Sequence, residues 1–340
     1  MSVTFTRRKA LGLVAGLSAA TLVGCSEGTP SGGTTTAGGG ATTASGDSTA
    51  ATGTTTKISV GVIPILDVAP IYLGVDQGFF ADEGLDLTLE SGQGGAAIVP
   101  GVTSGSLQFG FSNVVSLMLA NARGLGLKAL AAGAASTGDT EADFGAVLVK
   151  ADSGIKRAAD LAGKSIAVNT LQNIQTTTIN EMVRADGGDP AGIQYVELAF
   201  PDIVPAIERG DVAAGQLVEP FRTIGLDAGL VSVGANYAAT DPNLLVAAYF
   251  TTKSYAGANP QIVTKFTAAM NKSLEYAQAN PDAVRKILST YTQIQPDVAA
   301  KAVLPKWDPE INRAAVQKLA DLGTSDGLFP SAPDLDALLP

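Results

Sequence analysis

After Lys57 the chain repeats one pattern, in which short apolar segments typical of strands alternate with segments of helical spacing. In the first half the predicted strands are 57–63, 85–90, 107–111 and 127–132, and the predicted helices are 69–78, 95–104 and 113–123. In the second half the predicted strands are 164–168, 193–198 and 212–218, and the predicted helices are 174–186 and 202–209. Such alternation is typical of α/β domains with a largely parallel sheet. The sequence therefore predicts two α/β units of similar construction.

Two stretches show the similarity of the halves most directly, "GVTSGSLQFGFSN" (101–113) and "AIERGDVAAGQLVEP" (206–220). In each, a predicted helix ends at a glycine, Gly105 or Gly210, and a strand follows that opens into a polar loop. Ligands of open α/β sheets bind beyond the carboxyl ends of the strands. Two facing lobes would therefore enclose a ligand between them.

The last part of the chain adds one strand and a run of helices. "LLVAAYFTT" (244–252) is a predicted strand, and the residues from Gln261 onward have mostly helical spacing. This region contains the only tryptophan, Trp307. We expect Trp307 to serve packing rather than ligand contact.

The first 24 residues have the organisation of a signal peptide. A basic segment with Arg7 and Arg8 precedes an apolar run from Leu11 to Val23, which is too short to span a bilayer. The run "LVGC" (22–25) resembles the lipobox of bacterial lipoproteins and predicts lipidation of Cys25; a free or buried thiol is the alternative. The paired arginines also resemble a twin-arginine export signal, but Ala10 stands where that signal favours Phe, so the export route stays open.

Residues 26–56 are rich in Ser, Thr, Gly and Ala and contain two charged residues, Glu27 and Asp47. A segment of this composition has almost nothing to bury and is expected to be a flexible linker. Together with Cys25 it predicts a module held at the outer face of the cell membrane by a lipid anchor.

Composition excludes several classes of function. The chain has no histidine and a single cysteine, so Ser-His-Asp and Cys-His nucleophile systems and imidazole metal ligands are not available. Its net charge is −10, which would repel a nucleic-acid backbone. We find no phosphate-binding loop, dinucleotide fingerprint or EF-hand, and expect neither a cofactor nor a metal.

Four motifs in order resemble the nitrate/sulfonate/taurine-type solute-binding proteins, a family that also includes binders of thiamine pyrimidine precursors. They are "APIYLGVDQGFFADEGLDLTL" (69–89), "VTSGSLQFGFSN" (102–113), "GIKRAADLAGKSIAV" (154–168) and "AIERGDVAAGQLVEPF" (206–221). The resemblance covers roughly residues 57–250.

The resemblance implies a type II periplasmic-binding-protein fold, with two α/β lobes, a two-stranded hinge and a ligand cleft between the lobes. The implied lobes are 57–150 plus 246–340, and 151–245, with hinge segments near 149–152 and 243–248. It further implies a monomer that captures a small organic solute and delivers it to an ABC permease and its ATPase.

Candidate ligand contacts in the first lobe follow predicted strands or begin helices. A helix start is a place where free N–H groups receive an anionic ligand group. Asn113 could equally be a plain helix cap. The candidates are Leu66, Asp67, Ala69, Gln93, Gly94, Gly95, Ser112 and Asn113.

Candidate contacts in the second lobe lie in "NTLQNIQT" (169–176) and at Glu219. Family members often have Gly-Ser and then His in the first of these loops, so the amides here favour hydrogen bonding over a histidine-assisted anion contact. Glu219 would either accept N–H groups from a ligand or hold its own loop. The candidates are Asn169, Thr170, Gln172, Asn173, Thr176 and Glu219.

The substrate and two alternative functions stay open at this stage. Few basic residues occur in the candidate loops, so a zwitterion or nitrogenous ring suits them better than a bare anion, and both a sulfonate-like and a heterocyclic nutrient fit the family. One alternative is a ligand-sensing lipoprotein that feeds a membrane receptor. The other is an enzyme; a pyrimidine synthase on this fold relies on a histidine and a cysteine-rich motif, and this chain has neither.

Overall fold

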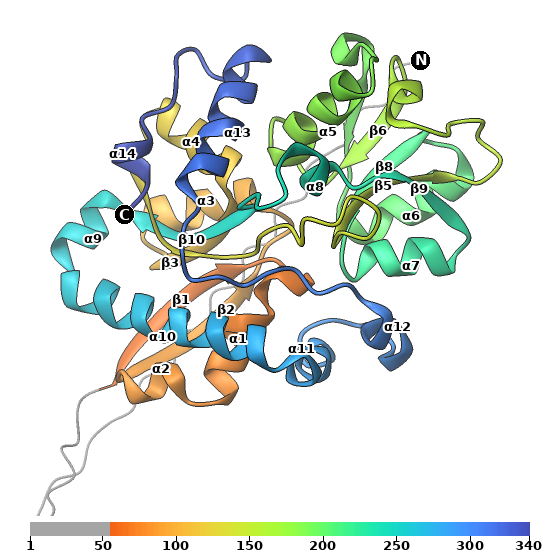
Figure 1. The fold of residues 1–340 in the computed structure, drawn as a ribbon. Helices are drawn as coiled ribbons and strands as arrows, with labels where there is room; N and C mark the ends of the chain where they lie inside the picture. The colour runs from red at the N-terminus through yellow and green to blue at the C-terminus, as the bar shows by residue number, and fades with distance from the viewer. Residues whose placement is uncertain (1–54) are drawn as a thin grey trace, which may run out of the picture. The chain divides into compact units, whose positions relative to one another are not determined.

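The computed structural model describes residues 55–340, whose strands form two sheets of five strands each (Figure 1). The predicted signal peptide, Cys25 and nearly all of the predicted linker lie outside the described residues. The first sheet, in the order β2-β1-β3-β10-β4, consists of β1 (Thr56–Val62), β2 (Leu85–Ser91), β3 (Phe109–Asn113), β4 (Leu127–Ala132) and β10 (Ala247–Thr252). The second, in the order β7-β6-β8-β5-β9, consists of β5 (Gly145–Lys150), β6 (Ser165–Val168), β7 (Gln194–Glu197), β8 (Ala214–Val218) and β9 (Leu230–Gly234).

The two sheets have the same construction. β1 pairs in parallel with β2 and β3, and β6 pairs in parallel with β7 and β8. The fourth strand of each sheet, β10 or β5, is antiparallel to both of its neighbours. Each sheet is therefore mixed but largely parallel, as predicted: only β10 or β5, which the chain enters on arriving from the other sheet, runs against the other four strands.

The helices cover the faces of the sheets, and the last six belong to the C-terminal part of the chain (Figure 1). Helices α3 and α6 end at Gly105 and Gly210, whose φ angles of 81° and 78° favour glycine at a helix end. The helices are α1 (Ala69–Asp76), α2 (Phe79–Asp82), α3 (Gly95–Ser104), α4 (Val114–Ala122), α5 (Ile174–Ala185), α6 (Phe200–Arg209), α7 (Phe221–Asp227), α8 (Asn236–Thr240), α9 (Lys253–Ala258), α10 (Pro260–Ala279), α11 (Pro281–Leu288), α12 (Pro296–Lys301), α13 (Arg313–Ser325) and α14 (Leu335–Leu338).

Two segments carry the chain between the sheets, and they lie side by side. The backbone N–H of Ser136 donates to the carbonyl of Leu244 at 2.9 Å, and that of Val246 donates to Ala134 at 2.9 Å. The first crossing thus lies between β4 and β5, in residues 133–144. The hinge predicted near 149–152 is wrong, because residues 145–150 form β5 of the second sheet. The crossing before β10 includes the segment expected near 243–248.

Trp307 lies in an extended segment between α12 and α13 rather than in a helix, and it is buried. Its indole Nε1 donates to the carbonyl of Asp67 at 3.2 Å. The tryptophan therefore packs inside the molecule and supports the loop that follows β1.

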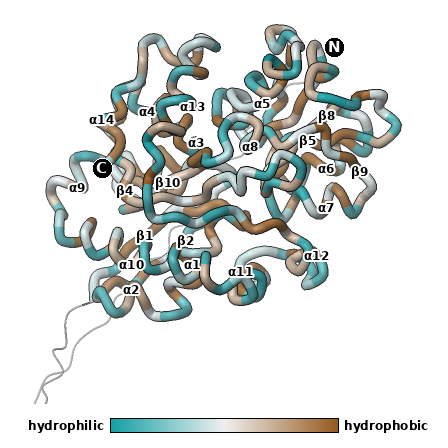
Figure 2. Tube along the Cα trace, in the orientation of Figure 1, coloured by the Kyte–Doolittle hydropathy of each residue, from teal (hydrophilic) through white to brown (hydrophobic). Residues whose placement is uncertain are grey.

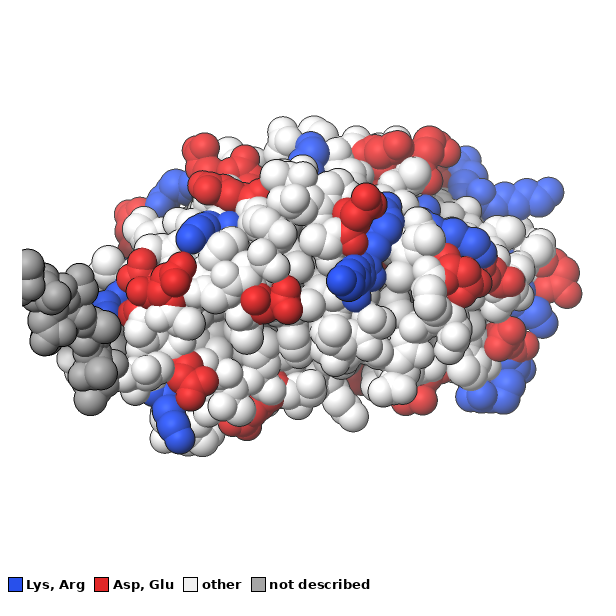
Figure 3. Space-filling view, turned by 90° about the horizontal axis from the view of Figure 1, so that it is seen from below, with Lys and Arg blue, Asp and Glu red and all other residues white. Residues whose placement is uncertain are grey.

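Apolar residues concentrate in the strands of both sheets, as the hydropathy colouring in Figure 2 shows. On the face seen in Figure 3, acidic and basic side chains are interspersed, without a large patch of one sign. None of the helices among the described residues is long and apolar enough to cross a membrane.

Candidate functional site

A small cavity of about 30 Å³ lies where strands of both sheets end. Ile63 follows β1, Asn113 ends β3, Asn169 follows β6 and Val218 ends β8. These are the carboxyl ends of parallel strands, the edge where α/β sheets bind ligands. The full lining is Ile63, Ile65, Asp67, Phe111, Asn113, Asn169, Asn173, Ile174, Gln175, Phe200, Val218, Tyr237, Val246 and Ala247.

Four of the residues predicted to contact ligand line this cavity: Asp67, Asn113, Asn169 and Asn173. They come from both halves of the chain, so the structure brings together the two predicted groups of contacts. A cavity of about 30 Å³ has no room for an organic solute as it stands. A solute could enter if the two sheets moved apart.

The other predicted residues do not line the cavity. Leu66, Ala69 and Ser112 are fully buried, whereas Gln93 and Gln172 are exposed. Thr176 is half-buried, and its hydroxyl accepts from the backbone N–H of Asn173 at 3.3 Å.

Gly94 and Gly95 precede and begin α3, as the sequence predicts, and both are buried. A Cβ atom built on Gly94 would lie 2.9 Å from Asn169 Nδ2 and 2.9 Å from Thr170 Cγ2, which belong to the second half of the chain. The loop before α3 thus contacts the loop after β6 directly, and there is no room for a side chain between them.

The amide side chains of the cavity form a hydrogen-bonded network. Asn173 Oδ1 accepts from the backbone N–H of Gln175 at 3.0 Å and of Thr176 at 3.3 Å, and thereby caps α5. Its Nδ2 donates to Asn169 Oδ1 at 2.9 Å, and Gln175 Oε1 accepts from the backbone N–H of Asn169 at 2.7 Å. Gln175 Nε2 donates to Gln216 Oε1.

Asn113 joins the two sheets. Its Oδ1 caps α4 by accepting from Ser116 N at 2.9 Å, and it also accepts from Ile174 N of α5 at 3.4 Å. The helix cap considered from the sequence is thus confirmed, and contact of Asn113 with a ligand stays a prediction.

Asp67 is the one lining residue that carries a formal charge near neutral pH. It lies in a short 3₁₀ turn, Leu66–Val68, and its side chain is 2% exposed. Its Oδ1 has no hydrogen-bond partner. Burial, reinforced by the nearby carboxylates of Asp143 and Glu219, raises the pKa of Asp67 to about 7.

Glu219 is buried but does not line the cavity. Its carboxylate accepts from the backbone N–H of Thr223 at 3.1 Å and of Val303 at 3.2 Å, and from Arg222 Nη1 at 3.3 Å. Burial raises the pKa of Glu219, and these bonds oppose the rise. The contacts hold its own loop against the C-terminal segment; contact with a ligand stays a prediction.

Ten lining residues were not singled out from the sequence. Gln175 lies within the predicted polar segment 169–176, and its position in the first turn of a helix was a usable signal. Phe200 and Tyr237 begin or lie in helices of the second half, and nothing in the local sequence places them at the cavity. The rest are Ile63, Ile65, Phe111, Ile174, Val218, Val246 and Ala247.

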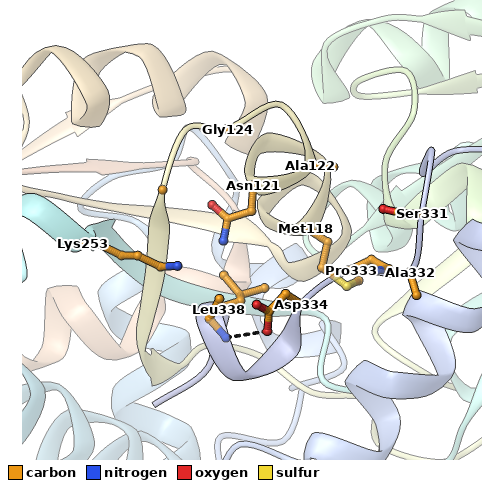
Figure 4. A pocket seen from close by; sticks show the side chains of 12 residues that line it. Met118, Asn121, Ala122, Gly124, Lys253, Ser331, Ala332, Pro333, Asp334 and Leu338 are labelled. Carbon is orange, nitrogen blue, oxygen red and sulfur yellow. Dashed lines mark hydrogen bonds between the residues drawn. The ribbon is translucent and has the colours of Figure 1, made fainter.

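A larger cavity of about 440 Å³ lies elsewhere, between α4, the start of α9 and the C-terminal segment (Figure 4). Its polar side chains serve the fold. Asn121 Oδ1 accepts from Leu127 N at 2.6 Å, and Asp334 Oδ1 caps α14 by accepting from Ala337 N at 2.9 Å. This larger cavity lies where β4 begins, at the edge of the sheet opposite the carboxyl ends of the parallel strands, and only one half of the molecule lines it. We therefore regard the smaller cavity as the candidate site.

Helix α13 and the residue after it connect α4 of the first half to α5 of the second. Asp326 Oδ1 lies 2.7 Å from Arg184 Nη1, and Asp326 Oδ2 accepts from Asn180 Nδ2 at 2.8 Å. Since α5 also carries Asn173 and Gln175, this contact fixes the helix that lines the cavity.

We expect Asp326→Ala to lower the free energy of unfolding by about 1 kcal/mol, because it removes a partly buried ion pair and a hydrogen bond. Chemical denaturation measures the change. Asp211→Ala is the matched control, since the Arg209–Asp211 pair is exposed and its loss should change little. Equal losses of unfolding free energy in the two variants would mean that the α5–α13 contact stabilises the protein no more than an exposed ion pair does.

Solved structures of similar fold include binding proteins. The alkanesulfonate-binding protein SsuA from Xanthomonas axonopodis pv. citri aligns with a TM-score of 0.70 and 18% identity over 83% of this chain and 97% of its own. The nitrate-binding protein NrtA from Synechocystis PCC 6803 aligns with a TM-score of 0.72 and 13% identity over 84% of this chain and 86% of its own. The ligand-binding component of an ABC-type import system from Staphylococcus aureus aligns with a TM-score of 0.72 and 14% identity over 84% and 96%.

These likenesses establish the fold class, the type II periplasmic-binding-protein fold expected from the sequence. Residues 66–284 match the model of the NMT1/THI5-like family, and the chain belongs to that family.

Relatives by sequence include enzymes. The 4-amino-5-hydroxymethyl-2-methylpyrimidine phosphate synthase of Aspergillus parasiticus is 26% identical over 231 residues, which are 63% of this chain and 64% of that protein. The synthase THI5 of Saccharomyces cerevisiae is 24% identical over 249 residues, 68% of this chain and 70% of that protein.

Proposed function

We propose that this protein is a solute-binding protein of an ABC importer, which captures a small organic solute between two lobes and delivers it to a membrane permease. The observation that carries the proposal is the cavity at the strand ends, lined by Asp67 and Asn113 from one half of the chain and Asn169 and Asn173 from the other. A ligand held by both halves stabilises their closed arrangement, which is what a permease recognises.

The two halves act in this proposal as the lobes of the binding protein. The paired crossing segments around Ala134–Ser136 and Leu244–Val246 are narrow enough to serve as its hinge. The names of the structural neighbours support the class of function, because they are binding proteins for alkanesulfonate and nitrate and a component of an import system. The protein would work outside the cytoplasm as a monomer, anchored through Cys25.

Catalysis is the second candidate, because the curated relatives are pyrimidine phosphate synthases. The chain has no histidine and no cysteine besides Cys25. Among the residues that the structure describes, no group of His, Cys, Asp and Glu side chains is placed to hold a metal ion. The amides of the cavity bind one another. Binding without turnover therefore accounts better for these side chains.

The experiment is a thermal-shift panel on protein unfolded and refolded to remove any carried-over ligand. The panel holds taurine, alkanesulfonates, nitrate, bicarbonate, aromatic acids and aminopyrimidines. A ligand present at about 100 times its dissociation constant adds roughly 2.7 kcal/mol to the stability of the protein. Stabilisation by one chemical class, with the compound recovered unchanged, supports the proposal; turnover of that compound would favour the enzyme instead.

Gly94→Val tests the closing of the two halves. Gly94 has extended backbone angles that valine tolerates, but the new side chain would meet Asn169 and Thr170 across the cleft. We expect affinity for the ligand found in the panel to fall at least about tenfold, which is 1.4 kcal/mol. Stability without ligand should change little, because the halves can separate.

Ala96→Val, at an exposed position of the same helix, is the control. Unchanged affinity in Gly94→Val would contradict closure at this contact.

A further inference from the structure

We propose that the solute carries a protonated nitrogen in a flat group, such as an amidinium or a protonated amino-heterocycle, and that Asp67 is the residue that selects it. The inference rests on the proposed function and names the class of ligand that the same cavity takes.

The first argument is the charge of the cavity wall. No lysine or arginine occurs among the residues that line it, and Asp67 is the one side chain there that becomes charged near neutral pH. Arg222, the nearest basic residue in sequence to a lining segment, is paired with Glu219. A cavity with this wall attracts a cation and repels an anion.

The second argument is that backbone donors at the helix starts, which an anion would use, are already engaged. At the start of α5, the N–H groups of Gln175 and Thr176 donate to Asn173 Oδ1, and that of Ile174 donates to Asn113 Oδ1. At the start of α4, the N–H of Val114 donates to the carbonyl of Val246 at 3.1 Å. A sulfonate or nitrate would have to break these bonds before either helix could receive it.

The third argument is the one polar atom of the lining that is buried and has no partner. Asp67 Oδ1 is fully shielded from solvent and accepts no hydrogen bond within the protein. A buried acceptor without a partner is costly. A charged N–H donor on the ligand would satisfy it with a charge-assisted hydrogen bond.

The shape of the wall favours a flat ligand. The side chains between the polar groups are aromatic or branched aliphatic, including Phe111, Phe200 and Ile174. Because the cavity holds about 30 Å³, a thin molecule requires the smallest separation of the two halves.

The titration of Asp67 predicts that binding of the cation depends on pH. The raised pKa of this residue, about 7, means that the carboxylate forms as pH rises through neutrality. A ligand whose positive charge does not titrate in this range should then bind more tightly at higher pH. The charges of Asp143 and Glu219 raise the pKa of Asp67. The charge of Asp67 in turn raises the pKa of three tyrosines, Tyr237, Tyr249 and Tyr291. The pKa of each of these three tyrosines is raised well above its usual value, so they stay neutral.

The experiment compares three flat probes of nearly equal shape by calorimetry on the full chain: benzamidinium, benzamide and benzenesulfonate. We expect benzamidinium to bind, with an affinity at least about tenfold above that of benzamide, and benzenesulfonate not to bind. Raising the pH from about 5.5 to 8 should tighten benzamidinium binding by roughly tenfold or more. Asp67→Asn, which keeps the shape of the side chain, should remove both the preference and the pH dependence. Asp86→Asn, at an exposed position on β2, should change neither.

The outcomes separate this inference from the proposed function. Binding of benzenesulfonate or nitrate without binding of benzamidinium would overturn the inference and leave the solute-binding function standing. Equal affinity for benzamidinium in the parent and in Asp67→Asn would also overturn it. Absence of binding by any of these probes and by every member of the thermal-shift panel would overturn both.

Discussion

Gly95→Ala is expected to destabilise the protein by about 3 kcal/mol, at the upper end of the cost of overpacking. A Cβ atom at this position would lie 1.9 Å from Ser112 Oγ, 2.5 Å from Ser112 Cβ and 2.8 Å from Ser112 Cα. The hydroxyl could rotate away, but the Cα belongs to β3 at the centre of the first sheet. Either α3 or β3 would therefore have to shift.

Denaturant unfolding of the parent and the variant measures this loss. Gly257→Ala is the matched control, because Gly257 lies in α9 with ordinary backbone angles and no atom within 4 Å of the added Cβ. The same substitution there should be neutral or stabilise by up to about 1 kcal/mol. A loss at Gly95 no larger than about 0.5 kcal/mol, the usual range for a surface change, would mean that α3 adapts freely.

This contact gives Gly95 a structural role that the sequence did not reveal. The glycine pair at 94–95 was expected to open a helix start toward a ligand. Neither glycine lines the cavity. Gly95 lets α3 pack against β3, and Gly94 lets the two halves of the chain meet.

Most of the fold was predictable because its signals are local. Strands such as β1 and β2 alternate or are continuously apolar, and helices such as α3 and α6 end at glycines, so their bounds lie close to those expected. β5 and β9 were missed. β5 pairs antiparallel with β8, which lies far along the chain, and no local pattern in "GAVLVK" states which sheet it joins. The position of the first hinge was wrong for the same reason.

The candidate site was predictable at the level of strand ends and no further. Asp67, Asn113, Asn169 and Asn173 follow or end strands or cap helices, which are properties of the local sequence. Contacts between the two halves decide which donors and acceptors of these residues remain free to bind a ligand. The sequence could not show that the amides of α5 satisfy one another while Asp67 Oδ1 stays without a partner.

Asp67→Asn is expected to make the ligand-free protein more stable than the parent at alkaline pH, by up to roughly 4 kcal/mol at a shift of this size. The pKa of Asp67 is raised in the folded state from 3.8 to about 7. Between these values the folded protein holds a proton that the unfolded chain has lost. The free energy of unfolding of the parent therefore falls as pH rises from about 4 to about 7 and is level above that range. Asparagine has no charge to bury and lacks this loss.

The measurement is the difference in unfolding free energy between the two proteins, taken by chemical denaturation at a series of pH values. Glu219 titrates in both proteins, so most of its own contribution cancels in the difference. The two proteins should be about equally stable near pH 4 and diverge up to about pH 7; parallel curves would contradict a buried carboxyl without a partner. Asp86→Asn should follow the parent throughout. The Asp67 carboxylate would then lower the stability of the empty protein, while the other side chains of the cavity are hydrogen-bonded amides and apolar groups. This pattern is expected where binding rather than folding requires the charge.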